Sequence, residues 1–154
     1  MPDLAIQEHA EFSLATILIA RGAVCTLELP EPGRLTTSGA LTLLWHGPRR
    51  FLAMRDGARP KLPDGLRAKL GGSAHVADAS ASHLVVTVSG TRAAEALGKL
   101  LPIDLHPRVF TPGSVALTRA AHIDVAIWRA ADASFGLACP SSYAENFRHH
   151  LASL

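Results

Sequence analysis

The sequence predicts an α+β fold made of two similar halves, with mostly antiparallel sheets and few helices. Short apolar runs rich in β-branched residues are separated by turn signals, which is typical of strands. Few segments repeat apolar residues at helical spacing. The order of motifs in residues 12–79 returns in residues 80–154, after an N-terminal arm, residues 1–11, that shows no periodicity and is expected to be flexible. Helices inserted among antiparallel strands in this way cover one face of each sheet.

The first half opens with the apolar run Leu14–Ala20, LATILIA, whose β-branched residues predict a strand. Propensity leaves Gly22–Leu29 undecided, and a loop is expected from Pro30 through Gly39 because prolines and glycines punctuate it. The remaining predictions are strands at Ala40–His46, Phe51–Met54 and Ser73–Asp78, with a helix from Pro63 to Gly71 between the last two.

The second half is more regular. His83–Ser89 alternates between two faces, with Leu84, Val86 and Val88 on one of them, as a strand with one buried face does. Thr91 is expected to cap a helix that stops at Pro102. A loop with three prolines, residues 102–113, follows, and further strands are predicted at Ser114–Thr118, Ile123–Trp128 and Phe135–Cys139.

The C-terminal helix has the clearest signals. Ser142 and Glu145 form a capping box, and Tyr143, Phe147 and Leu151 recur every four residues. An amphipathic helix is therefore predicted up to the C-terminus.

Aromatic residues align the two halves with each other. Trp45 and Phe51 correspond to Trp128 and Phe135 at nearly constant separation. By this alignment the undecided segment Gly22–Leu29 matches the helix that follows Thr91. A short helix is therefore predicted over residues 22–29.

The composition favours a chain that has a partner. Only 18% of the residues are charged, against about 25% in an average soluble chain, and the mean hydropathy is +0.20. Apolar surface must therefore be exposed, and contiguous apolar surface usually marks a partner site. The net charge of +2 argues against general nucleic-acid binding.

The sequence offers no sign of export or of a membrane span. No apolar run approaches the roughly 18 residues that cross a bilayer, and the first charged residues, Asp3 and Glu8, do not suit a signal peptide. Cys25 and Cys139 have no disulfide or metal spacing and are interpreted as small buried apolar residues. A cytoplasmic protein is expected.

Positive charge is concentrated between Arg49 and Lys69. This segment holds seven basic residues and two acidic ones. It could meet an acidic partner surface, although a solvated loop and helix face is the more common explanation of such a run.

The motifs of common enzymes are missing from the sequence. It contains no GxSxG, GxxxxGK[ST] or GxGxxG. The adjacent His149 and His150 would point about 100° apart on a helix, so they cannot chelate one ion together. Asp124 is a lone acid in an apolar strand. One interpretation is a buried functional acid with a raised pKa, but we expect it to point outward or to pair with Arg119 or Arg129. We therefore predict no catalytic, cofactor-binding or metal-binding residue in this chain.

Three stretches resemble one known family. They are LLPIDLHPRVFTPGS at Leu100–Ser114, LWHGPRRFLA at Leu44–Ala53, and SGTRA at Ser89–Ala93. Together with the strands between them, they are similar to the gamma subunit of heterotetrameric sarcosine oxidase, over all but the N-terminal arm. That family in turn resembles the folate-binding domain of glycine-cleavage T-protein, an aminomethyltransferase.

The resemblance implies a non-catalytic gamma subunit that assembles and stabilises an oxidase converting sarcosine to glycine. It implies that FAD, FMN, NAD and tetrahydrofolate belong to the larger subunits, and that this chain packs chiefly against the alpha subunit. The loop Pro102–Gly113 and the hairpin between Trp45 and Phe51 are the expected docking elements.

An alternative implied by the same resemblance is a small tetrahydrofolate-binding protein of one-carbon metabolism that uses Asp124 and a neighbouring arginine. The T-protein relatives carry GG-x-x-DD where this chain has residues 120–124, AAHID. The glycines and one acid are gone, which weakens this alternative. A standalone paralogue without a partner also remains open.

Overall fold

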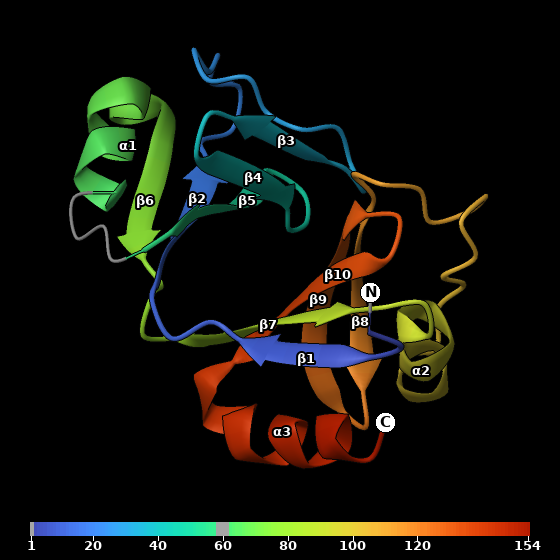
Figure 1. The fold of residues 1–154 in the computed structure, drawn as a ribbon. Coiled ribbons are helices and arrows are strands. Elements are labelled where there is room, and N and C mark those ends of the chain that lie inside the picture. Colours follow the sequence, from blue (N-terminus) through green and yellow to red (C-terminus); the bar gives the residue numbers. More distant parts are fainter. Residues whose placement is uncertain (1, 58–61) are drawn as a thin grey trace. The chain divides into compact units, whose positions relative to one another are not determined.

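The computed structural model describes residues 2–57 and 62–154, which divide into two compact units (Figure 1). The N-terminal unit is Ala10–Ala81, and the C-terminal unit joins the residues up to His9 with Ser82–Leu154. Each unit holds a five-stranded antiparallel sheet, so the predicted α+β class is confirmed. No helix within the described ranges is both long and apolar enough to cross a membrane.

The N-terminal unit packs one helix, α1 (Leu62–Leu70), against its sheet. Leu62, Leu66 and Leu70 of α1 are buried and share a core with sheet residues such as Phe51. The sheet order is β3-β4-β5-β2-β6, and a 3-10 turn, Gly71–Ser73, follows α1. The strands are β2 (Phe12–Ile19), β3 (Leu35–Ser38), β4 (Leu41–Trp45), β5 (Arg50–Asp56) and β6 (Ala74–Asp78).

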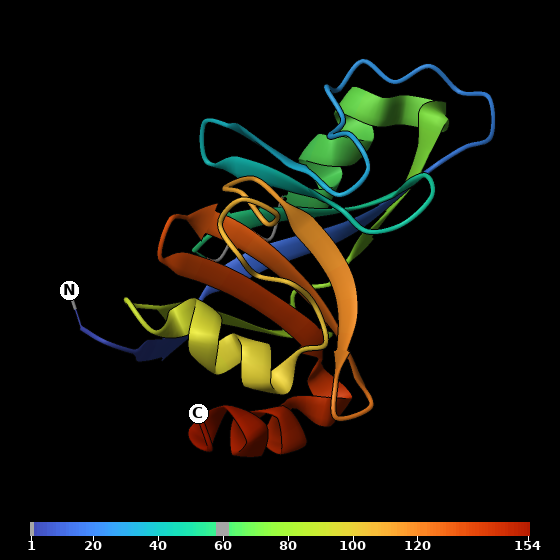
Figure 2. The same cartoon turned by 90° about the vertical axis from the view of Figure 1, so that its right-hand side faces the viewer.

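The C-terminal unit packs two helices, α2 (Ala93–Leu100) and α3 (Ala144–Ala152), against its sheet (Figure 2). Leu97 of α2 and Phe147 of α3 are fully buried in one core with Phe135. The sheet order is β1-β7-β10-β9-β8, and a 3-10 turn, Ser141–Tyr143, precedes α3. The strands are β1 (Ala5–Glu8), β7 (His83–Ser89), β8 (Val115–Ala120), β9 (Ile123–Ala131) and β10 (Ser134–Pro140).

The two sheets share one pairing scheme. In each, a first strand, β2 or β7, lies between a fifth strand and the last strand of a three-strand meander, β3-β4-β5 or β8-β9-β10. The fifth strand is β6 in the N-terminal unit, where it follows α1. In the C-terminal unit it is β1, which the start of the chain supplies. The similarity of the halves therefore extends to topology, and the two units differ in the origin of one edge strand.

The expectation of a flexible arm over residues 1–11 is wrong for Ala5–Glu8. These residues pair antiparallel with β7, from Ala5 opposite Ser89 to Glu8 opposite Val86. Glu8 also accepts two hydrogen bonds from Arg148 of α3, at 2.6 and 3.0 Å. Three of the four β1 side chains are exposed, so the strand has no apolar alternation that could have revealed it.

The short helix predicted over residues 22–29 is also wrong. The structure has turns, bends and irregular backbone there, with Gly22 at φ 73°. Cys25, Leu27 and Leu29 pack as partly buried residues against the core of the N-terminal unit. Val24 and Thr26 are β-branched and favour extended backbone, whereas the matching segment of the second half is rich in alanine.

Residues 35–38, expected in a loop, form β3 and pair with β4 through a two-residue turn at Gly39. Neither predicted helix cap is present. The Thr91 hydroxyl donates to Asp3 Oδ1 at 3.3 Å, and α2 begins after Arg92 without a side-chain cap. Ser142 lies inside the 3-10 turn, so it cannot form the expected capping box at the start of α3.

The other predicted elements are confirmed with small shifts in their ends. In β7, Leu84, Val86 and Val88 lie in the core of the C-terminal unit, as the alternation predicted. In α3, Phe147 and Leu151 are buried.

Candidate docking surface and surface pocket

The loop between α2 and β8, residues 102–113, has no helix or strand and yet is firmly held (Figure 2). Leu105 and Phe110 are buried in the core of the C-terminal unit. Between them lie four consecutive exposed residues, His106–Val109, which we call the tip of the loop. Long loops of this kind are usually functional, so the tip is a candidate contact surface.

A buried arginine holds this loop in place. Arg129 of β9 is 4% exposed, and its Nη1 donates to the carbonyl oxygens of Phe110 at 2.7 Å and Leu105 at 3.3 Å. Its Nη2 donates to the carbonyl of Asp132. The guanidinium also lies 5.1 Å from the centre of the Phe135 ring, within the range of a cation–π contact.

Sequence reasoning missed this role of Arg129. The signal was present in β9, because Ile123, Val125 and Ile127 face the core and Arg129 continues their two-residue period. A charged side chain on a core face needs internal acceptors, and the preceding loop supplies them.

The second expected docking element is the hairpin of β4 and β5. Trp45 lies opposite Phe51, and the exposed Pro48, Arg49 and Arg50 form its outer end. Arg49 has φ 58°, and its Nη1 donates to the carbonyl of Ile19 at 2.8 Å. Arg49 therefore serves the structure of the hairpin, whereas Arg50 forms no ion pair within the described residues.

The basic run between Arg49 and Lys69 is divided among several elements. Arg67 on α1 pairs with Asp64 at 2.8 Å and also donates to the carbonyl of Val76 in β6. Arg59 and Lys61 lie outside the described residues. Arg49 and Arg67 therefore have roles within the fold, and both interpretations of the run, a solvated face and an acidic partner surface, stay predictions.

Asp124 lies in an exposed ion pair. Its Oδ1 is 2.8 Å from Nε of Arg119 on β8, and both side chains are more than two-thirds exposed. Asp124 therefore points outward and pairs with Arg119. Arg129, the other candidate partner, is buried against the loop 102–113. Arg119 and Asp124 lie directly opposite each other in the pairing of β8 with β9.

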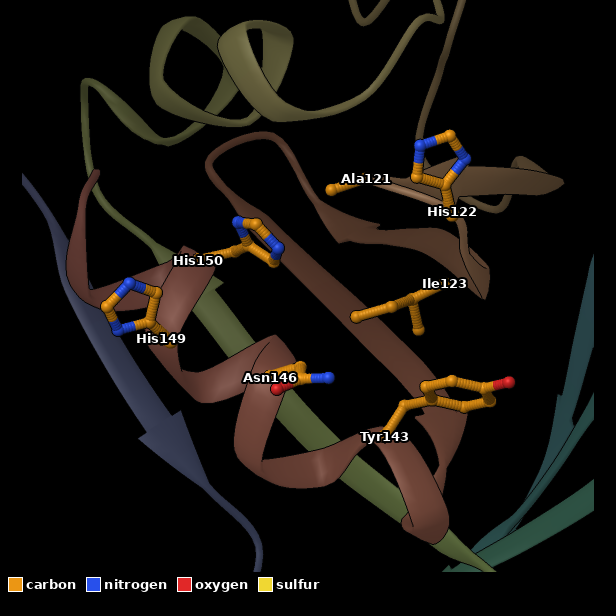
Figure 3. A pocket seen from close by; sticks show the side chains of 7 residues that line it. All are labelled: Ala121, His122, Ile123, Tyr143, Asn146, His149 and His150. Carbon is orange, nitrogen blue, oxygen red and sulfur yellow. The ribbon is translucent and has the colours of Figure 1, made fainter.

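A polar hollow of about 320 Å³ lies between α3 and the turn that joins β8 to β9 (Figure 3). His122 comes from this turn, and Asn146, His149 and His150 come from α3. Its other lining residues are Ala121, Ile123 and Tyr143.

Three imidazoles, those of His122, His149 and His150, line this hollow. The rings of His149 and His150 lie 6.3 Å apart with their planes at 67°. In the part of the chain that the structure describes, no three histidine, cysteine or acidic side chains are arranged to hold a metal ion. The absence of a metal site therefore stays a prediction.

The two cysteines are free thiols. Burial raises the pKa of the Cys139 thiol to about 11, so its reactive thiolate is scarce near neutral pH. Cys25 is half-buried against the core of the N-terminal unit. Cys139 is confirmed as a buried apolar residue.

Comparison with known proteins finds the same family throughout. The sequence model described as "Sarcosine oxidase, gamma subunit family" matches residues 10–153. The sarcosine oxidase subunit gamma of Corynebacterium sp. strain U-96 is 36% identical over 110 residues, 71% of this chain and 53% of the relative. The subunit gamma of Arthrobacter sp. is 39% identical over 94 residues, covering 60% and 46%. The chain thus spans about half the length of these relatives.

A solved structure also matches. A chain of the heterotetrameric sarcosine oxidase from Corynebacterium sp. U-96, in complex with pyrrole 2-carboxylate, superimposes with a TM-score of 0.87 and 29% sequence identity. The match covers 96% of this chain and 81% of the other. Since the family model spans nearly the whole sequence and the fold agrees, the chain belongs to the sarcosine oxidase gamma subunit family.

Proposed function

We propose that this chain is a non-catalytic gamma subunit of a heterotetrameric sarcosine oxidase and acts in assembly and stabilisation of the complex. The observation that carries the proposal is the structural match over 96% of the chain to a component of such an oxidase. The complex demethylates sarcosine oxidatively to glycine, and the chemistry belongs to the other subunits.

The state of its reactive side chains supports a structural role. Asp124 is neutralised by Arg119 at an exposed position, and burial suppresses the reactivity of Cys139. A general acid or base works best in a site that shifts its pKa and excludes water. Asp124 lies in contact with water, and the raised pKa of the Cys139 thiol keeps it protonated near neutral pH, so neither residue suits such a role.

The proposed partners are the other sarcosine oxidase subunits, chiefly alpha, in the cytoplasm. FAD, FMN, NAD and tetrahydrofolate are assigned to those subunits. Docking uses the loop 102–113 and the β4–β5 hairpin, where Arg108 and Arg50 are exposed. Neither arginine forms an ion pair within the described residues, so both can meet carboxylates of a partner.

Co-expression with the larger subunits tests the proposal. A tagged wild-type chain should purify with them in a flavin-containing complex, whereas the chain alone should show no flavin absorbance. Arg50→Glu and Arg108→Glu should each reduce recovery of the complex. The charge-matched control Lys99→Glu, on the exposed face of α2, should not. Elution of the wild-type chain apart from the larger subunits would refute the assignment.

Calorimetry addresses the folate-binding alternative. The isolated chain should release no binding heat with tetrahydrofolate. Binding that Asp124→Asn abolishes would instead favour the small tetrahydrofolate-binding protein, because that residue is the acid retained from the T-protein pattern.

A further inference from the structure

The tip of the loop, His106–Val109, displays an apolar side chain that the chain itself leaves uncovered. Val109 is 63% exposed, although its neighbour Phe110 is buried. Pro107 and Arg108 beside it are also exposed. An apolar residue held in water next to an unpaired cation suits a partner surface better than it suits solvent.

The base of the tip is closed by one side chain. The carbonyls of Leu105 and Phe110 flank the tip on either side, and Nη1 of Arg129 binds both of them. The side chains of Leu105 and Phe110 are themselves buried, 4% and 7% exposed. The two ends of the tip are therefore fixed in the protein interior while its middle projects outward.

Hydrogen bonds inside the loop fix the tip further. The backbone N–H groups of Val109 and Phe110 both donate to the carbonyl of His106, at 2.8 and 2.9 Å. The N–H of His106 donates to Oδ1 of Asp104 at 2.8 Å. The tip thus has a defined conformation in the free chain, which reduces the ordering cost that a flexible segment pays on binding.

We propose that Val109 and Arg108 form a preorganised docking knob, with Arg129 as the positioning residue that holds it before the partner arrives. The knob fits an apolar recess with a carboxylate at its rim on a partner subunit. Arginine is enriched among the residues that dominate binding energy at interfaces, and a guanidinium pairs with a carboxylate through two parallel bonds. This inference rests on the proposed function, because the partner is one of the larger oxidase subunits.

A matched pair of valines tests the knob. Val109→Asp places a negative charge where the recess expects an apolar group, and Val24→Asp places the same charge at a valine of the N-terminal unit that is 90% exposed. The full-length variants are captured on a sensor surface and exposed to co-expressed larger subunits. We expect Val109→Asp to weaken binding at least tenfold and Val24→Asp to stay within about twofold of wild type.

Three outcomes are distinguishable. Wild-type binding with loss in Val109→Asp alone supports the knob. Equal binding by wild type and Val109→Asp overturns the knob and leaves the proposed function standing. Failure of the wild-type chain to bind overturns both. Circular dichroism of each variant shows that a loss of binding is not a loss of fold.

The positioning role predicts a different kinetic signature. Asp104→Ala removes the hydrogen bond to the His106 amide at an exposed position, and Arg129→Met removes the clamp. Both should speed hydrogen exchange at the Val109 and Phe110 amides and lower the association rate several-fold. If Arg129→Met does not fold, Asp104→Ala alone tests whether the tip is preorganised. Unchanged exchange and association in Asp104→Ala would overturn preorganisation.

Discussion

Replacing Arg129 with methionine removes the guanidinium and keeps a long apolar side chain in its place. Three carbonyls, those of Leu105, Phe110 and Asp132, lose a donor. Each buried polar group left unpaired costs about 1–3 kcal/mol. The contact with the Phe135 ring adds about 1–2 kcal/mol at a desolvated site.

An opposing contribution comes from the buried charge itself. No carboxylate within the described residues lies within ion-pair distance of Arg129, so its desolvation is compensated only by carbonyl dipoles and the ring. Replacing buried charged groups by apolar ones can be stabilising by about 1–4 kcal/mol. Loop carbonyls near the surface can also recover water. We therefore expect Arg129→Met to lower the free energy of unfolding by about 2–4 kcal/mol. Arg129→Lys should have an intermediate effect, because an ammonium lacks the planar fork of donors with which the guanidinium binds several carbonyls at once.

Urea unfolding followed by tryptophan fluorescence measures this effect. Each unit contains one tryptophan, Trp45 in β4 and Trp128 in β9. In a Trp45→Phe background the signal reports on the C-terminal unit alone, next to the mutated residue. A midpoint for Arg129→Met equal to or above that of the background would refute the reasoning. It would show that relief of the desolvated charge outweighs three carbonyl bonds.

Three further predictions concern the C-terminal unit. Gly136→Ala should cost more than about 3 kcal/mol in urea unfolding, because a Cβ there would lie 2.0 Å from the Trp128 ring; an unchanged midpoint would contradict the packing. His122→Gly should stabilise by about 0.5–1 kcal/mol in the same assay, since His122 sits at φ 76° in the turn of β8 and β9; a lower midpoint would argue against strain. The hydrogen bond from Arg148 lowers the pKa of Glu8, so the attachment of β1 should be strongest above pH 4.5 and weaken as the pH falls through the lower folded value. Protection against hydrogen exchange at the Gln7 and His9 amides, which face β7, should then fall in acid for wild type after correction for the intrinsic exchange rate, and a Glu8→Gln variant should lack this pH dependence.

Strands with an apolar core face were predictable from the sequence. Their period of two places Leu84, Val86 and Val88 on one side wherever the chain is extended, and burial of that side makes the register unambiguous. The expected docking loop was also recognised, because three prolines prevent regular structure there. Its anchoring was not, since the guanidinium that holds it lies on a later strand.

Two edge strands, β1 and β3, escaped prediction, whereas the edge strands β6 and β8 were predicted. β1 and β3 each have four residues and are mostly exposed or half-buried. Their backbone hydrogen bonds come from β7 and β4. Local composition does not reveal such partners, and for β1 the partner is distant in the chain. The failed helix over residues 22–29 has a related cause, because packing of Cys25, Leu27 and Leu29 against the core of the N-terminal unit overrides the local helix prediction.

The sequence by itself determined the α+β class, the apolar faces of the main strands and the family, since these depend on local periodicity and on motifs read in order. The tertiary structure decided which strand completes each sheet and what each arginine does. From the sequence, Asp124 could have paired with either Arg119 or Arg129, because the two arginines lie on neighbouring strands, β8 and β9. Arg119 stays in water with Asp124. Arg129 enters the core, because only the folded loop brings the carbonyls of Leu105 and Phe110 to a cation that would otherwise be too costly to bury.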